Sequence, residues 1–271
     1  MKIQYKHFLF YTVLIAVIAC SDDGSPTTQS EELMSSVSSS SESKKEQSSS
    51  SYKENWDYLN PEIDYGEMTD ARDGQVYKTV KIGDQTWMAE NLNYETDNSY
   101  CSKKYCALYG RLYSWATAMD SAGKFSSDGV GCGYGKFCSP TFPVRGVCPE
   151  GWHLPRSGDW GTLIHVVSDF KQLKSKRGWD GMSAGCQDCN GTDDFGFSML
   201  PAGFCNIAPY GASFGGMGHN TSFWSSSEYS GDGEYSGKWL AYAVVHNDKV
   251  VYLDYYPSKS DGYSVRCVKD E

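Results

Sequence analysis

Apolar and polar residues alternate along several short stretches of the chain, and this period of two predicts β-strands. One pair of strands is Gln75–Ile82 and Gln85–Ala89, which the two residues Gly83 and Asp84 join as a β-hairpin. Three further strands are predicted near the C-terminus, at Lys238–Val245, Lys249–Tyr255 and Tyr263–Lys269. Together these strands favour an antiparallel sheet.

Two other stretches repeat apolar residues at every third or fourth position, which is the spacing of one face of an α-helix. The first predicted helix ends near Gly123 and is indicated by Leu108, Leu112, Trp115, Ala116 and Met119. The second is indicated by Trp160, Leu163, Ile164 and Val167. It follows Ser157, a good N-cap residue, and Asp159, whose charge suits the first turn. Two helices beside antiparallel strands predict an α+β domain.

The stretches without periodicity predict long loops. Residues 124–147 contain many glycines and two cysteines, so we expect a loop closed by a disulfide. Residues 178–222 are rich in Gly, Asn and Asp with few periodic signals, so we expect long loops there as well. Binding residues concentrate on such loops.

Aromatic residues in loop-like sequence are the candidate ligand-binding residues, namely Tyr210, Phe214, Tyr229 and Tyr235. Exposed rings on loops stack on sugar rings or anchor protein partners. The alternative is packing in the core, which we expect for Trp152, Trp160, Trp224 and Trp239. These four loop residues lead us to expect a polysaccharide or protein ligand.

An ordered series of motifs runs from Asp73 to Val268, and most of them lie in the second half of the chain. The motifs are Asp73-Gly74-Gln75-Val76-Tyr77, Cys148-Pro149-Glu150-Gly151-Trp152-His153-Leu154-Pro155, Gly191-Thr192-Asp193-Asp194-Phe195-Gly196-Phe197, Leu200-Pro201-Ala202-Gly203, Phe223-Trp224-Ser225-Ser226-Ser227 and Ser264-Val265-Arg266-Cys267-Val268. Over about residues 70–270 the chain resembles the Fibrobacter succinogenes major paralogous domain family.

This resemblance implies a secreted, loop-rich and disulfide-stapled domain similar to the C-type-lectin-like fold, and it assigns no biochemical activity. Together with the chain topology, it favours a disulfide between Cys148 and Cys267. The lectin-like fold is shared with formylglycine-generating enzymes, but this chain has no close cysteine pair after Cys205 to match theirs. The calcium-dependent sugar-binding motifs of C-type lectins, such as Glu-Pro-Asn and Trp-Asn-Asp, are also missing.

The N-terminal residues, Met1–Cys20, resemble a bacterial lipoprotein signal peptide, with a positive start, an apolar segment and a lipobox that ends in Cys20. We therefore expect lipidation of Cys20 and attachment to a membrane; an ordinary secretory signal is the alternative. Residues 21–55 are dominated by Ser and predict a disordered linker, and residues 56–271 form the domain. Ser21-Asp22-Asp23 resembles an acidic export signal, so we expect an outer-membrane lipoprotein exposed on the cell surface.

Charge and cysteine content narrow the function further. A net charge of −10 with no clustered Lys and Arg argues against a nucleic-acid partner. Ten cysteines in a chain with an export signal predict disulfides, and lipidation of Cys20 would leave nine, an odd number. Local pairs are expected at Cys101 with Cys106 and at Cys132 with Cys138. Cys186, Cys189 and Cys205 remain unassigned, although Cys186 and Cys189 favour a disulfide over a redox or zinc motif.

No motif in the chain predicts catalysis or a cofactor. There is no His-Glu-x-x-His, Gly-x-Ser-x-Gly, P-loop or dinucleotide-binding fingerprint, and His153 beside Trp152 is expected to be structural. Asn190, Asp193 and Asp194, with Thr192, are weak calcium candidates, because Asx turns place oxygens in loops in the same way. We therefore expect no cofactor, with calcium as the one candidate metal.

The combined features favour a surface-anchored binding or adhesion module for a polysaccharide or a surface protein. Two alternatives remain open. One is a carbohydrate-active or cysteine-dependent enzyme on the same scaffold, and the other is a structural protein of the envelope.

Overall fold

The computed structural model describes residues 57–102, 105–180, 188–208, 211–229, 241–246, 251–255 and 257–271, all within one compact unit, Ser49–Glu271. Cys20, the linker at 21–55, Cys186, Tyr210 and Tyr235 lie outside these ranges. Within the described ranges, no helix is long and apolar enough to cross a membrane.

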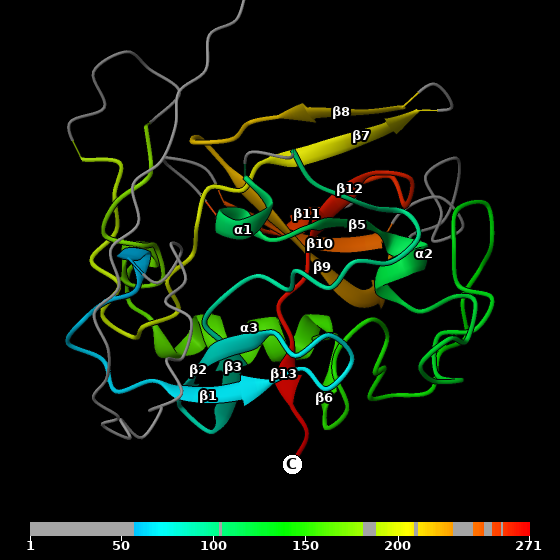
Figure 1. Cartoon of the computed structure of the whole chain (residues 1–271), viewed down its shortest axis with the longest axis horizontal. Coiled ribbons are helices and arrows are strands. Elements are labelled where there is room, and N and C mark those ends of the chain that lie inside the picture. The colour runs from blue at the N-terminus through cyan, green and yellow to red at the C-terminus, as the bar shows by residue number, and fades with distance from the viewer. Residues whose placement is uncertain are drawn as a thin grey trace, which may run out of the picture. The chain divides into compact units, whose positions relative to one another are not determined.

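The first sheet has five short strands in the order β1-β2-β3-β13-β6, and every pair in it is antiparallel (Figure 1). Its strands are β1 Gly66–Thr69, β2 Val76–Ile82, β3 Gln85–Met88, β6 Trp152–His153 and β13 Val268–Lys269. The predicted hairpin at 75–89 is confirmed, with Ile82 opposite Gln85. Gly83 in the turn has φ +60°, a conformation that suits glycine.

The second sheet has the order β11-β10-β9-β12-β5-β4, and β7 pairs with both β12 and β8. Its strands are β4 Ser99–Tyr100, β5 Leu112–Ser114, β7 Phe204–Ala208, β8 Gly211–Gly215, β9 Thr221–Glu228, β10 Ala241–His246, β11 Val251–Tyr255 and β12 Gly262–Ser264. All pairs are antiparallel except β12 with β9.

The described helices are short. They are α1 Cys106–Tyr109, α2 Trp115–Ala118, α3 Ser157–Val166 and the 3-10 helix η2 Phe170–Gln172. In Figure 1, α3 runs between the two sheets. Its Trp160 ring lies 4.8 Å from the ring of Trp87 on β3 and 5.5 Å from that of Phe223 on β9. This helix therefore joins the cores of both sheets, as its apolar face predicts.

The single helix predicted over 108–122 is wrong. The chain instead forms α1, then β5, then α2. Gly110 has φ +72°, and a Cβ there would lie 2.8 Å from the carbonyl oxygen of Leu92, so the helix ends before it. Leu112 then pairs with Ser264 on β12, and Ser114 caps α2 by accepting a hydrogen bond from the amide of Thr117. Sheet pairing overrides the helical spacing here.

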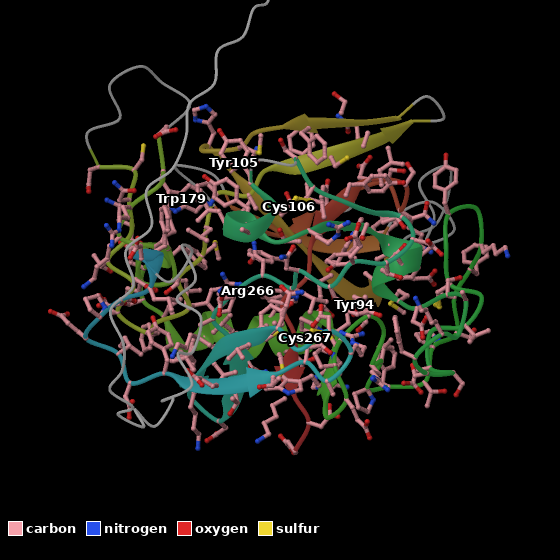
Figure 2. All side chains as sticks on the ribbon, in the orientation of Figure 1. Tyr94, Tyr105, Cys106, Trp179, Arg266 and Cys267 are labelled. Atoms are coloured by element: carbon pink, nitrogen blue, oxygen red, sulfur yellow. A yellow bond between two sulfur atoms is a disulfide. The ribbon has the colours of Figure 1, made fainter. Side chains whose placement is uncertain are left out.

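Two further sequence predictions need correction. The long loops expected over 178–222 contain the β7–β8 hairpin and the start of β9. The strand expected at Tyr263–Lys269 is two strands in two different sheets, β12 and β13. The three residues between them cross from one sheet to the other, and Figure 2 shows Arg266 and Cys267 on this crossing.

The protein is thus an α+β domain that is mostly sheet, with disulfides at Cys101–Cys106, Cys132–Cys138 and Cys148–Cys267, the three pairs expected from the sequence. The last of these joins the segment before β6 to the segment before β13. Because it spans 119 residues, it contributes on the order of 4–5 kcal/mol through the unfolded chain.

Candidate functional site

An open cleft of about 630 Å³ lies where β3, β6, β13 and the start of α3 meet the loop at Phe142. This volume falls within the usual range for small-molecule sites, about 300–1,000 Å³. The cleft is placed by the first sheet, since β13 pairs with both β3 and β6, with Val268 opposite both Trp87 and His153.

His153 links two elements that line the cleft. Its Nδ1 lies 2.7 Å from Oδ1 of Asp270, and its Nε2 lies 3.6 Å from Oδ2 of Asp159 on α3. Partial burial lowers the pKa of His153, but the two carboxylates outweigh it, so the pKa is raised above its usual value. Burial raises the pKa of Asp159, while His153 and the amide of Arg156 lower it, and the net shift is downward. The two carboxylates therefore favour the protonated form of His153.

Charges in the cleft balance one another. The basic residues that line it are Lys81, His153, Arg156 and Lys269, and the acidic ones are Asp84, Asp159, Asp270 and Glu271. Arg156 pairs with Asp159, with Nε 3.7 Å from Oδ1. The surface therefore offers many hydrogen-bonding groups with little net charge.

One wall of the cleft is apolar. Phe142 is 47% exposed, and the buried residues Val144 and Leu154 also line the cleft. The amide of Leu154 donates to the carbonyl oxygen of Val144 at 2.8 Å, which holds this wall against β6. An exposed ring beside polar groups suits a ligand with both apolar and polar faces.

Ser226 on β9 is the buried polar side chain among the described residues that line the cleft. It is 1% exposed, and its amide donates to the carbonyl oxygen of Pro155 at 2.9 Å. Its hydroxyl makes no hydrogen bond within the part of the chain that the structure describes. A buried unpaired hydroxyl costs about 1–3 kcal/mol, and because its oxygen has almost no accessible surface, the fold itself bears this cost.

Phe142 belongs to the stapled loop, residues 124–147, which follows α2 and contains the Cys132–Cys138 disulfide. Among the described residues, four of the five exposed large apolar side chains lie on this loop. They are Val130 at 58%, Tyr134 at 56%, Phe137 at 69% and Phe142 at 47%. The sequence did not single out these residues, although aromatic residues among glycines and serines were the available signal.

Buried polar contacts hold the stapled loop in place. Oε1 of Glu228 accepts a hydrogen bond from the amide of Cys138 at 2.9 Å and pairs with Lys259. Lys259 also donates to the carbonyl oxygen of Lys136 at 3.1 Å, and its Nζ lies 4.1 Å from the ring centroid of Trp115. Burial lowers the pKa of Lys259. The loop is therefore fixed to the second sheet through β9.

Two of the four predicted ligand-binding residues, Phe214 and Tyr229, are described, and neither lines the cleft. Phe214 is partly exposed on β8 and lines a hollow of about 10 Å³ with Tyr105 and Tyr109, too small for a ligand. Tyr229 is partly buried just after β9. Tyr210 and Tyr235 lie outside the described residues.

The calcium candidates serve the protein itself. Asp193 is buried and accepts hydrogen bonds from the amide and hydroxyl of Ser198, at 2.7 and 2.6 Å. Burial raises its pKa to about 7. Asn190 accepts from the amide of Trp179, and Asp194 accepts from the side chain of Gln172. In the described ranges, no cluster of three or more His, Cys, Asp or Glu could hold a metal ion.

Two of the three unassigned cysteines are described. Cys189 is disulfide-bonded, while Cys186, its predicted partner, lies outside the described residues. Cys205 on β7 is free and buried. Burial raises the pKa of its thiol to about 11, which disfavours a reactive thiolate at neutral pH.

Comparison with known proteins gives one match. No curated protein and no solved structure matches the chain. The sequence model described as the Fibrobacter succinogenes major domain matches residues 80–269, which is more than half of the chain. The chain therefore belongs to the Fibrobacter succinogenes major domain family.

Proposed function

We propose that this chain is a surface-anchored binding or adhesion module for a polysaccharide or a surface protein. The observation that carries the proposal is the clustering of Val130, Tyr134, Phe137 and Phe142 on the stapled loop. Burying an exposed side chain of this kind in a complex contributes about 1.5–3 kcal/mol. Single exposed apolar residues are ordinary, whereas several on one loop favour an interaction site.

The way the loop is held supports the same proposal. Its disulfide and the buried Glu228–Lys259 pair fix the backbone that carries the rings. A rigid loop loses little conformational entropy when a ligand binds, so the exposed rings can contribute to affinity. The construction is that of a preorganised contact surface.

The similarity to C-type lectins and the lipid anchor are parts of this proposal. An α+β domain with a disulfide between the segments before β6 and β13 is consistent with the lectin-like fold. An apolar segment ending at Cys20, with a Ser-rich stretch behind it, suits a lipidated domain on a tether at the outer surface. The lipid on Cys20 would then bind the membrane, and the domain at residues 56–271 would bind the ligand.

The charges favour binding over hydrolysis. A glycosidase needs a carboxyl group with a raised pKa to protonate the leaving group. Among the described residues, the carboxyl groups with raised pKa are Asp193 and Asp261, and neither lines the cleft. The buried thiol of Cys205 gives no support to cysteine chemistry.

The test is a binding screen of the full chain, purified in detergent, against glycans and envelope proteins. We expect a ligand that binds the native chain and binds the Y134S/F137S variant at least about tenfold more weakly, a loss of about 1.4 kcal/mol. Val166 on α3 is also exposed, at 40%, so V166S is the matched control and should bind normally. A screen that finds no ligand for the native chain contradicts the proposal.

A further inference from the structure

We infer that strand β8 pairs with β8 of a second copy of this chain and so joins two domains into a symmetric dimer. This inference goes beyond the proposed function and does not depend on it, because β8 is a different surface from the stapled loop. Three observations support it. They are the free backbone groups on β8, the absence of charge on this strand, and the fit between two copies of its sequence.

Strand β8 is paired on one side only. Its partner is β7, with Ala208 opposite Gly211 and Phe204 opposite Gly215. Within the described ranges, no other strand pairs with β8. Figure 1 shows β8 above β7 at the top of the view, as the last strand of this part of the sheet. The outer side of β8 is therefore a free sheet edge among the described residues.

The hairpin geometry identifies which backbone groups face outward. Only two residues separate Ala208 from Gly211, and the residues that flank a turn of this length are hydrogen-bonded to each other. Bonding to β7 then alternates along β8, so the amide and carbonyl groups of Ala212 and Phe214 point away from β7. In the described part of the chain, these groups make no backbone hydrogen bond outside the β7–β8 pair.

The other described sheet edges are protected against strand addition, whereas β8 is not. Free edges invite another strand, and proteins protect them with charged residues, with short strands or with a covering segment. β1 contains Glu67, β11 contains Asp254, and β4 has only two residues. Beside β6, the amide of Leu154 is bonded to the carbonyl oxygen of Val144. β8 has five residues, Gly-Ala-Ser-Phe-Gly, with neither a charge nor a proline.

Two copies of β8 fit each other in an antiparallel register that places Ser213 opposite Ser213 of the second copy. In this register Ala212 faces Phe214 of the second copy, and the reverse, so the residues with free backbone groups meet and each pair exchanges two hydrogen bonds. The register also places each phenyl ring beside a methyl group and each Gly211 beside a Gly215, so no bulky side chains collide. Because a two-fold axis passes between the two serines, the contact closes as a dimer and does not continue into a filament.

The contact is small, so we expect a weak dimer. A backbone hydrogen bond contributes about 0.5–1.5 kcal/mol net, and association itself has a cost in entropy. The dimer should therefore dissociate on dilution in solution and be favoured where two copies are held on one surface. It would present two stapled loops to one ligand, which would raise the avidity of binding.

Disulfide trapping in the full chain, purified in detergent, tests the register. The two Ser213 residues would form a non-hydrogen-bonded pair with Cα atoms about 4.5 Å apart, which a disulfide can span. The two Ala212 residues would lie diagonally, about 7–8 Å apart, which is too far for a disulfide. Under mild oxidation, we expect S213C to form at least about tenfold more disulfide-linked dimer than A212C.

Two controls exclude other sources of linked dimer. All cysteine variants also carry C205A, because Cys205 is a free cysteine on the neighbouring strand. T69C lies at an exposed position of β1 and should form as little linked dimer as A212C. Equal trapping of S213C, A212C and T69C indicates collisions within a micelle and overturns the inference. Absence of trapping in S213C overturns it as well.

A charge at the same position tests the dimer without a cross-link. We expect S213K to weaken self-association at least about tenfold in sedimentation equilibrium, because two like charges would face each other across the axis. S213A is the matched control and should associate as the native chain does. Ser213 is exposed, so both variants should keep the native melting temperature. A native chain that stays monomeric at every concentration, or an S213K variant that associates as the native chain does, overturns the inference and leaves the proposed function standing.

Discussion

Two loops of this protein look alike in sequence and differ in what they do. The stapled loop, residues 124–147, and the Asp193 loop, residues 188–203, are both rich in Gly and polar residues. The stapled loop turns three of its four aromatic side chains outward, with Phe137 69% exposed. The Asp193 loop buries two polar side chains, Asp193 and Ser198, which are hydrogen-bonded to each other. Unsatisfied surface therefore marks the candidate binding loop, whereas internally satisfied polar groups mark the structural one.

The Asp193 loop is fixed by a buried arginine from the crossing between the two sheets. Arg266 donates to the carbonyl oxygens of Phe197 and Ser198, and its Nε donates to Oδ1 of Asn91 at 2.9 Å. Its guanidinium lies 4.3 Å from the ring centroid of Phe197. Burial lowers the pKa of Arg266 to about 9. One side chain thus connects both sheets to the loop, as its central place in Figure 2 indicates.

The largest loss of stability should follow the replacement of Arg266. We expect R266M to lower the free energy of unfolding by about 3–5 kcal/mol, because the carbonyl groups of Phe197 and Ser198 lose their donors and Asp193 loses a neighbouring cation. Urea denaturation measures the change. K81M, an exposed cation in the cleft, is the control and should stay within about 0.5 kcal/mol. Equal stability of R266M and the native chain would remove the argument that the Asp193 loop is structural.

Sequence patterns could predict the elements whose partners lie nearby in the chain. The β2–β3 hairpin follows from alternation and a two-residue turn, and α3 follows from the spacing of Trp160 and Leu163. Leu112 was placed in a helix because its pairing partner, Ser264, lies more than 150 residues away. Long-range pairing of this kind leaves no local signal.

The candidate site was harder to predict, for a similar reason. Phe142, His153, Ser226 and Asp270 lie on different elements and meet only because β13 pairs with β6 and because β9 passes Pro155. Sequence indicated that aromatic loop residues matter, but exposure depends on the fold. Phe214 and Phe137 look equivalent in sequence, and only the second is largely exposed.

The second-largest effect is the pH dependence of stability that Asp193 causes. Burial raises the pKa of Asp193 in the folded protein from its ordinary value of 3.8 to about 7, so between these pH values the folded state holds a proton that the unfolded state has released. Stability should therefore fall as pH rises from about 4 to 7, by roughly 2–4 kcal/mol at about 1.4 kcal/mol per unit. D193N, which carries no proton to lose, should flatten this dependence in unfolding measured from pH 4 to 8. D194N, at an exposed carboxylate, should leave it unchanged; an equal slope in D193N and the native chain would contradict this account.

The smallest loss of stability should follow removal of the disulfide in the stapled loop. This variant also gives the sharpest test of the difference between the stapled loop and the Asp193 loop. Replacing both cysteines of the Cys132–Cys138 disulfide by Ala removes a short loop closure, worth about 2 kcal/mol in the chain-entropy model. Because Glu228 and Lys259 still hold the same backbone, we expect the domain to remain folded. Ligand affinity should nevertheless fall, since the segment between the two cysteines, which carries Tyr134 and Phe137, would lose one of its restraints. The C101A/C106A variant removes a loop of nearly the same length far from the stapled loop, so it should match the stability loss without the loss of affinity. If both variants bind the ligand equally well, the rigidity of the stapled loop has no part in recognition.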